Sequence, residues 1–322
     1  MKPTRLIATS LAVALIGLSA EARDLTSSDV FPSGYPTVEA VAHRGRLIEE
    51  RSGGRHRIAS LGAGDLDSEN LTVGQVGNGR LDMARVNLAV LNNLVPSTVV
   101  LSLPFLFKSA QQMQRVLDGP VGEEILADMA GSGLIGLCFY DAGYRSYAAN
   151  RPIRSVTDMK ALKVRVQQAD KWGEMLRAMG AQPVAMPNGQ IIPALRNGVI
   201  DALETTLPNF AVYRQFEAAK FFSVTQQSMA PGVLVFSKRV WDEMTPQDRE
   251  LIRTAAHDSV TVMRSLREQY EVDSRRLIEA AGGQIVENVD RKSFADLLLP
   301  LYPKLITDPR LQEMVKRIQA TD

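Results

Sequence analysis

Short apolar runs alternate with longer helix-like stretches along the chain, as in α/β proteins. Between residues 36 and 51 apolar side chains recur at helical spacing, and Gly53 and Gly54 then favour the end of a helix. The apolar or β-branched runs predict strands of largely buried sheets. They cover residues 56–61, 81–86, 99–103, 134–140, 162–167, 183–186, 200–204 and 233–237.

A sustained helical pattern near the C-terminus predicts one unusually long helix. Thr245 suits the N-cap, Pro246 suits the first helical position, and Asp248 places a negative charge in the first turn. The pattern continues to residue 281, before Gly282 and a second glycine. At 1.5 Å per residue such a helix would be about 54 Å long, which exceeds the diameter of a small domain. We therefore expect it to run along two domains.

The first 22 residues are organised like a secretory signal peptide. Lys2 and Arg5 precede an apolar stretch at 6–20, and Ala20-Glu21-Ala22 has the small-x-small form of a cleavage site. We expect cleavage after Ala22. The apolar stretch is short for a membrane span, and no later segment approaches the roughly 20 apolar residues of a transmembrane helix. The sequence therefore predicts a soluble protein that is exported from the cytoplasm.

Composition narrows the possible functions further. Of the 322 residues, those after residue 22 suffice for two domains at about 100 to 200 residues each. The formal net charge is +1, and residues 1–22 contribute +1 of it, so the mature chain lacks the basic excess of a nucleic-acid binder. The chain also has no Pro- or Gly-rich linker, which favours several strand crossovers between the domains. Cys138 is the only cysteine, and we expect a buried apolar role for it.

Two segments resemble cofactor or metal motifs in part of their residue pattern but lack the elements or residues that those sites require. Residues 131–136 read G-x-G-x-x-G, but a helix precedes them and a strand follows, which is the reverse of a dinucleotide site and favours a helix end. Residues 65–76 resemble a calcium loop in which Asn70 and Val76 replace the required glycine and glutamate. No nucleophile elbow is present. The histidines, His43, His56 and His257, are scattered and do not suggest a zinc site. We therefore expect no metal, no cofactor and no catalytic centre.

Several phrases in order along the chain resemble the substrate-binding subunits of tripartite ATP-independent periplasmic (TRAP) transporters, the DctP type. The resemblance covers essentially the whole mature chain and rests on residues 27–30, 49–55, 103–107, 117–122, 162–166 and 178–187. It implies the α/β, two-lobe periplasmic binding protein fold, with hinge strands and a long helix spanning both lobes. We expect lobe I to comprise residues 23–142 with 231–270, and lobe II to comprise 143–230 with 271–322.

The same resemblance implies the residues that bind a carboxylate. The arginine of the phrase at 162–166 is Arg165, which would form the main salt bridge to the ligand, and a second family arginine is similar to Arg145. A guanidinium suits this task because it offers two parallel donors to a desolvated carboxylate. Most members also carry an asparagine where this chain has Thr205, whose hydroxyl has less reach and fewer donors. The alternative for Arg165 is an ion pair with an internal acid, and the alternative for Arg145 is a surface or inter-lobe role.

Further phrases are similar to the family branch associated with uronic and related sugar acids, at 85–87, 139–141, 166–170 and 227–231. That branch typically has a tryptophan where this chain has Leu207. Phe210 and Tyr213 could form a wall of the cleft or face the core. Contacts to the hydroxyl groups of a polyol ligand could come from Glu69, Arg85, Asn87, Gln167 and Asn209, although each of these also has an ordinary structural interpretation.

Together these features predict a periplasmic protein that captures a small organic acid between two lobes. The first expectation is a sugar acid such as a uronate, and the alternative is a C4-dicarboxylate or another small carboxylate. The resemblance implies delivery to an integral membrane permease, and we expect a monomer that binds no nucleic acid. A periplasmic signalling component and an exported enzyme acting on sugar acids remain the rival classes.

Overall fold

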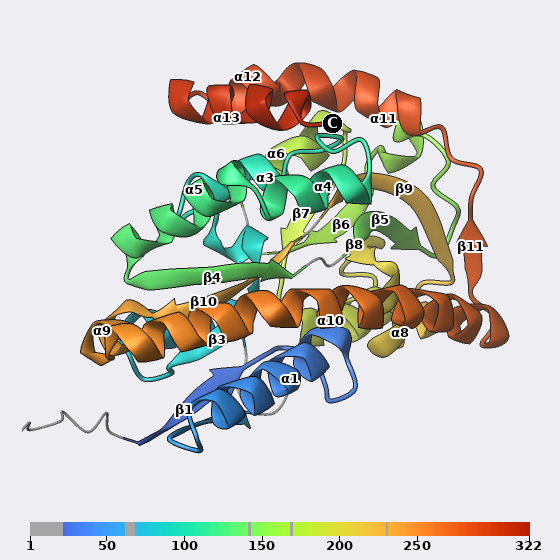
Figure 1. Ribbon diagram of the computed structural model, residues 1–322. Helices are drawn as coiled ribbons and strands as arrows, with labels where there is room; N and C mark the ends of the chain where they lie inside the picture. Colours follow the sequence, from blue (N-terminus) through green and yellow to red (C-terminus); the bar gives the residue numbers. More distant parts are fainter. Residues whose placement is uncertain (1–21, 62–67, 141–142, 168–169, 230) are drawn as a thin grey trace, which may run out of the picture.

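The computed structural model describes residues 22–61, 68–140, 143–167, 170–229 and 231–322, and Figure 1 shows their arrangement. The expected α/β fold is confirmed, with one sheet in each lobe. The sheet of lobe I has the order β2-β1-β3-β10-β4. Strands β1 and β2 are parallel, as are β1 and β3, whereas β10 runs antiparallel to β3 and β4. Its strands are β1 (Arg23–Ser28), β2 (His56–Leu61), β3 (Met83–Asn87), β4 (Leu134–Tyr140) and β10 (Gly232–Ser237).

The sheet of lobe II has the order β11-β9-β5-β8-β6-β7. Strand β5 is antiparallel to β8 and β9, and β6 is parallel to β7 and β8. The chain passes from β4 in lobe I to β5 in lobe II and returns from β9 to β10, so the lobes are joined by crossing segments. The strands of this sheet are β5 (Tyr144–Ala149), β6 (Lys163–Val166), β7 (Gln182–Ala185), β8 (Ala202–Thr206), β9 (Phe221–Met229) and β11 (Gln284–Val286).

Helices cover both sheets (Figure 1). Those before β4 are α1 (Pro36–Arg51), α2 (Glu69–Gly77), α3 (Thr98–Leu101), α4 (Ala110–Leu117) and α5 (Pro120–Asp128). Those inserted among the strands of lobe II are α6 (Asp170–Ala178), α7 (Ile191–Arg196) and α8 (Leu207–Val212). The remaining helices are α9 (Lys238–Glu243), α10 (Pro246–Ala280), α11 (Arg291–Leu298), α12 (Tyr302–Leu305) and α13 (Pro309–Ala320).

The predicted long helix is confirmed as α10, 35 residues in length. The Thr245 hydroxyl accepts a hydrogen bond from the Asp248 amide at 3.1 Å, which satisfies one of the free N–H groups at the helix start. Helix α10 packs against α1 and β4 in lobe I and against α8 in lobe II. Figure 1 shows it crossing the molecule from the region between β4 and α1 to the region of α8. One rigid element therefore supports both walls of any cleft between the sheets.

The strand predicted at residues 99–103 is wrong, because this segment contains helix α3 and a turn. Val99, Val100, Leu101 and Leu103 are all buried. A short apolar run buried on every side shows no periodicity that separates a strand from a helix. The glycine-rich motif at 131–136 does mark a helix end, since Gly133 has φ +76° between a short 3-10 turn and β4.

The expected lobe boundaries stay a prediction, and the contacts of the C-terminal helix bear on them. Helix α13 packs against α3 and α5 of lobe I. Arg310 pairs with Asp128 at 2.6 Å, and Arg317 pairs with Glu124 at 2.7 Å. Residues 309–320 therefore pack on helices that precede β4 in the chain. Residues 1–21 of the expected signal peptide and residues 65–67 of the calcium-like segment lie outside the described residues.

Candidate functional site

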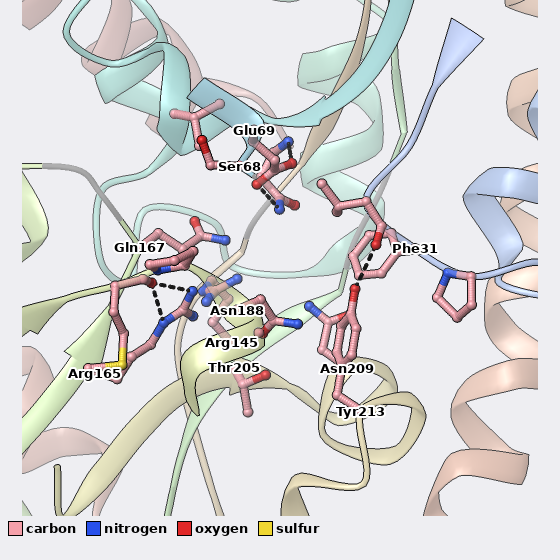
Figure 2. Close-up of a pocket in the computed structure, with 17 residues that line it drawn as sticks. Phe31, Ser68, Glu69, Arg145, Arg165, Gln167, Asn188, Thr205, Asn209 and Tyr213 are labelled. Atoms are coloured by element: carbon pink, nitrogen blue, oxygen red, sulfur yellow. Dashed lines mark hydrogen bonds between the residues drawn. The ribbon is translucent and has the colours of Figure 1, made fainter. Parts of the chain in front are cut away.

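A cavity of about 510 Å³ lies between the two lobes (Figure 2). Segments from both lobes line it, including the connection between β1 and α1, the start of α2, and the ends of β6 and β8. All the predicted ligand residues except Arg85 are among its lining residues: Glu69, Asn87, Arg145, Arg165, Gln167, Thr205 and Asn209. Residues that are distant in the sequence are therefore brought to one place by the fold.

Arg165 supplies a positive charge on the lobe II wall. It lies on β6 with 5% of its surface exposed, and its Nε and Nη2 atoms donate to the Met186 carbonyl at 3.1 and 3.0 Å. Burial and the neighbouring Arg145 lower the pKa of Arg165 to about 10, so it remains charged at neutral pH. The backbone carbonyl orients the guanidinium without neutralising it. This leaves a fixed, desolvated cation beside the cavity.

Arg145 has a different environment, although it lines the same wall. Both its Nε and Nη2 atoms donate to the Glu204 carboxylate, and Nη2 also donates to the Glu204 carbonyl at 3.0 Å. The two side chains are 4% and 2% exposed. Glu204 therefore offsets the charge of Arg145 in a buried ion pair, which was not expected from the sequence. Thr205, beside Glu204 on β8, lines the cavity, and its hydroxyl makes a long contact of 3.5 Å to the Thr206 carbonyl.

The lobe I wall carries an acidic side chain held by Asn87. Glu69 accepts hydrogen bonds at 2.8 Å from both the backbone amide and the side-chain amide of Asn87. Its position is set by Ser68, which caps α2 by accepting from the Leu71 amide at 3.3 Å. Figure 2 shows Glu69 and Arg165 on opposite sides of the cavity. The cavity thus has a cationic wall and an acceptor-rich wall.

Aromatic residues close one side of the cavity and connect the lobes. The Tyr213 hydroxyl donates to the Val30 carbonyl at 2.9 Å, and the Tyr35 hydroxyl donates to Asn209 Oδ1 at 2.8 Å. The Phe31 ring stacks on Tyr35, with centroids 3.8 Å apart, and lies 6.0 Å from the Tyr213 ring. These bonds join the β1–α1 connection of lobe I to α8 and the residue after it in lobe II. The described conformation is therefore closed on this side.

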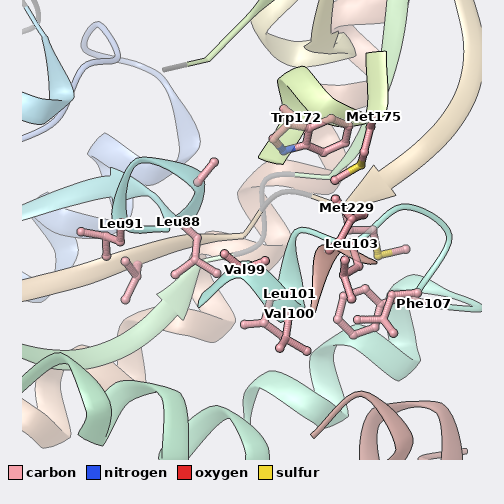
Figure 3. Packing of buried hydrophobic residues seen from close by; sticks show 14 of the residues in the cluster. Leu88, Leu91, Val99, Val100, Leu101, Leu103, Phe107, Trp172, Met175 and Met229 are labelled. Atoms are coloured by element: carbon pink, nitrogen blue, oxygen red, sulfur yellow. The ribbon is translucent and has the colours of Figure 1, made fainter. Parts of the chain in front are cut away.

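A second contact between the lobes is apolar. Figure 3 shows Trp172 and Met175 of α6 together with Leu103, Phe107 and Met229 in one packed cluster. The cluster continues from lobe I into lobe II without interruption. Burial of such side chains stabilises a contact by roughly 25 cal/mol for each Å² removed from water. Apolar packing therefore supports the closed arrangement together with the polar bonds at the aromatic side.

Several other residues singled out in the sequence lie away from the cavity. Arg85 does not line the cavity, so its predicted direct ligand contact is not supported by its position. Phe210 and Leu207 belong to the core of lobe II. Cys138 is buried as expected, and burial raises the pKa of its thiol to about 12, which keeps it unreactive.

No role in the site was expected from the sequence for Phe31, Tyr35, Asn188 or Gly189, and Met186 takes part through its backbone carbonyl. Tyr35 meets Asn209 across 174 positions of the chain, so no local pattern could indicate their contact. The signal that existed was the family phrase at 27–30, which ends next to Phe31.

The charges define what the cavity can accommodate. Arg145 is paired with Glu204, which leaves Arg165 on the lobe II wall and Glu69, with Arg85 4.0 Å behind it, on the lobe I wall. A ligand carboxylate is favoured beside Arg165, whereas Glu69 accepts hydrogen bonds and repels a second anion. Within the described residues, no group of three His, Cys, Asp or Glu side chains is placed to hold a metal ion. In the same part of the chain, no helix has both the length and the apolar character to cross a membrane.

A family model described as bacterial extracellular solute-binding protein, family 7 (DctP), matches residues 27–308. The chain belongs to this family. A relative of this DctP-family protein is a solute-binding protein of Chromohalobacter salexigens, which is 31% identical over 306 residues, 94% of this chain and 91% of the relative.

Solved structures extend the comparison. A TRAP periplasmic solute-binding protein of Bradyrhizobium sp. BTAi1, in complex with α/β-D-galacturonate, is 47% identical. It superimposes with a TM-score of 0.91 over 93% of this chain and 100% of that chain. A second such protein, of Xanthobacter autotrophicus Py2 with bound β-D-galacturonate, is 42% identical, with a TM-score of 0.90 over 93% and 100% of the two chains. The DctP-family chain is therefore a solute-binding protein of the TRAP type with two lobes.

Proposed function

We propose that this solute-binding protein captures a uronate, of which D-galacturonate is the model compound. The observation that carries the proposal is the pair of opposite walls, with Arg165 on lobe II and Glu69 on lobe I. In the proposed complex, the carboxylate of the uronate pairs with Arg165 and its hydroxyl groups donate to Glu69. The bound galacturonate of the 47% identical relative supports the same ligand class.

The residues of the site favour a sugar acid over a C4-dicarboxylate. A dicarboxylate bound at Arg165 would direct its second carboxylate toward the lobe I wall, where Glu69 is 13% exposed and already accepts two hydrogen bonds. Like charges in a closed, weakly solvated cavity repel each other strongly. Hydroxyl groups, in contrast, supply donors to the remaining lone pairs of Glu69. Asn209, Gln167 and Thr205 provide further polar contacts for such a ligand.

We also propose a place for this capture in transport. The predicted signal peptide and the periplasmic relatives support export to the periplasm, and membership of the family supports delivery to a membrane permease. The closed conformation joins the lobes through Tyr35 and Tyr213, so ligand binding would be linked to a shape that a partner can recognise. The proposal involves no catalytic turnover.

Isothermal titration calorimetry tests this function. The purified protein is unfolded and refolded to remove carried ligand, then titrated with D-galacturonate, D-glucuronate, succinate and pyruvate. We expect both uronates to bind at least about 100-fold more tightly than succinate, a difference of about 2.7 kcal/mol. Tighter binding of succinate would keep the family function and overturn the proposed ligand.

A further inference from the structure

Arg85 is a buried charged residue that lies next to the ligand cavity without lining it. It is two positions before Asn87 on β3, so both side chains project from the same face of the strand. Arg85 Nη2 donates to Asn87 Oδ1 at 3.0 Å, and its Nη1 atom lies 4.0 Å from Glu69 Oε1. Its guanidinium therefore stands directly behind the acidic wall of the cavity.

The bonds of Asn87 fix the orientation of its amide. A guanidinium has donors only and a carboxylate has acceptors only. Arg85 therefore requires the Asn87 oxygen to point toward it, and Glu69 accepts from the Asn87 nitrogen at 2.8 Å. If the Asn87 amide were rotated by half a turn, its NH2 group would face the donors of Arg85 and its oxygen would face the carboxylate of Glu69, so both hydrogen bonds would be lost. The three residues form a chain with only one favourable arrangement.

The position of Arg85 is set by a glycine on the neighbouring strand. Gly232 is the partner of Asn87 in the register of β10 and β3, at the point where the chain returns to lobe I. A Cβ atom added to Gly232 would lie 2.5 Å from both Nε and Nη2 of Arg85. On another side, the Arg85 Cζ atom lies 4.9 Å from the centroid of the Phe31 ring. The guanidinium fits only because residue 232 has no side chain.

The charge of Arg85 is buried at a cost. Its Nε and Nη1 atoms have no hydrogen-bond partner among the described residues. Removing a guanidinium from water is expensive, and Glu69 and Asp29 supply the nearby negative charge that offsets this. A neutral glutamine would avoid the cost, but its amide can present either a donor or an acceptor and so could not fix Asn87. An arginine, which remains protonated, is suited to the task.

We infer that Arg85 is a positioning residue, which holds Asn87 and thereby Glu69 in the orientation that accepts hydrogen bonds from the hydroxyl groups of the ligand. This inference rests on the proposed function and refines it, because it assigns the recognition of hydroxyl groups to Glu69, whose orientation depends on Asn87 and Arg85. Gly232 contributes by leaving the space that the Arg85 guanidinium occupies.

A double-mutant cycle measured by calorimetry with D-galacturonate tests the inference. Arg85→Met removes the donors but keeps an unbranched side chain, and Glu69→Gln removes the charged acceptor. We expect Arg85→Met to weaken binding about 10- to 100-fold, the range for leaving a buried partner unsatisfied. The double variant should bind no more than about threefold more weakly than Glu69→Gln alone, because Arg85 acts through Glu69. If the loss of affinity in the double variant equalled the product of the two single losses, Arg85 would act independently of Glu69, and the inference would be overturned.

Arg44→Met is the matched control, because Arg44 is another fully buried arginine of lobe I whose Nη2 atom donates to Met83 Sδ away from the cavity. It should leave the affinity unchanged. If Arg85→Met does not fold, Gly232→Ala takes its place in the cycle, since it displaces the same guanidinium. Tight wild-type binding with additive effects would refute this inference alone, whereas no binding of any uronate by the wild type would refute the proposed function as well.

Discussion

Replacement of Arg165 by glutamine removes the cation from the lobe II wall while leaving a polar side chain of smaller size. In the wild type, two guanidinium donors are bonded to the Met186 carbonyl and the rest of the group faces the cavity. The variant would enclose the ligand carboxylate without a charged partner. Arg145 cannot substitute, because its guanidinium is already paired with Glu204.

The magnitude of this loss follows from the burial of Arg165, which is only 5% exposed. Removal of one partner from a buried ion pair costs about 3 to 5 kcal/mol. Because each 1.4 kcal/mol is tenfold in the dissociation constant, affinity for D-galacturonate should fall by about two to three and a half orders of magnitude. Arg165→Lys should fall between the wild type and Arg165→Gln, since an ammonium keeps the charge but loses the parallel donors.

Calorimetry with D-galacturonate measures this effect, and Arg196→Gln provides the matched control. Arg196 is also on lobe II, but its side chain is 61% exposed and pairs with Glu217 at 3.6 Å, so its replacement should leave the affinity unchanged. Thermal melts of the ligand-free variants check that each is folded. If folded Arg165→Gln retained an affinity close to that of the wild type, Arg165 would not be the carboxylate partner.

Tyr213→Phe removes the hydrogen bond to Val30 that joins the lobes, so affinity should fall about fivefold for a bond worth about 1 kcal/mol. An affinity equal to that of the wild type by calorimetry would refute a role of this bond in closure. Thr245→Ala removes the N-cap of α10 and should lower the melting temperature by about 2 °C, and an unchanged melt would contradict this. Burial raises the pKa of Asp29 from 3.8 to about 6, so the folded state holds a proton that the unfolded state has lost, and the contribution of Asp29 to stability declines as pH rises through this window. Urea melts should therefore show Asp29→Asn gaining stability relative to the wild type between about pH 4 and pH 6.5, and a constant difference would refute the assigned cause.

The sequence predicted best where one physical signal acts locally. Thr245 and Pro246 marked the start of α10, and the glycines after residue 281 marked its end within one residue. Strand β9 was missed because Thr225, Gln227 and Ser228 are buried although they are polar, so the strand shows no apolar run. The backbone of β9 pairs with β5 and β11, and within the strand Thr225 Oγ1 donates to Gln227 Oε1.

The site was predictable only in part, for a related reason. Arg165 and Glu69 were identified through the family resemblance, since neither residue stands in a pattern that indicates a cavity. The partner of Arg145 is Glu204, which lies 59 positions away. The same holds for Arg85, whose position depends on a glycine in a distant strand. Contacts between segments far apart in the sequence decide which charges are neutralised and which remain available for a ligand.

A crystal structure of the protein with D-galacturonate would test the assigned roles of Arg165 and Glu69. We expect a closed complex in which the ligand carboxylate lies within hydrogen-bond distance of the Arg165 guanidinium and hydroxyl groups lie within that distance of Glu69. A complex in which the carboxylate is bound away from Arg165, or in which no hydroxyl group contacts Glu69, would contradict these roles.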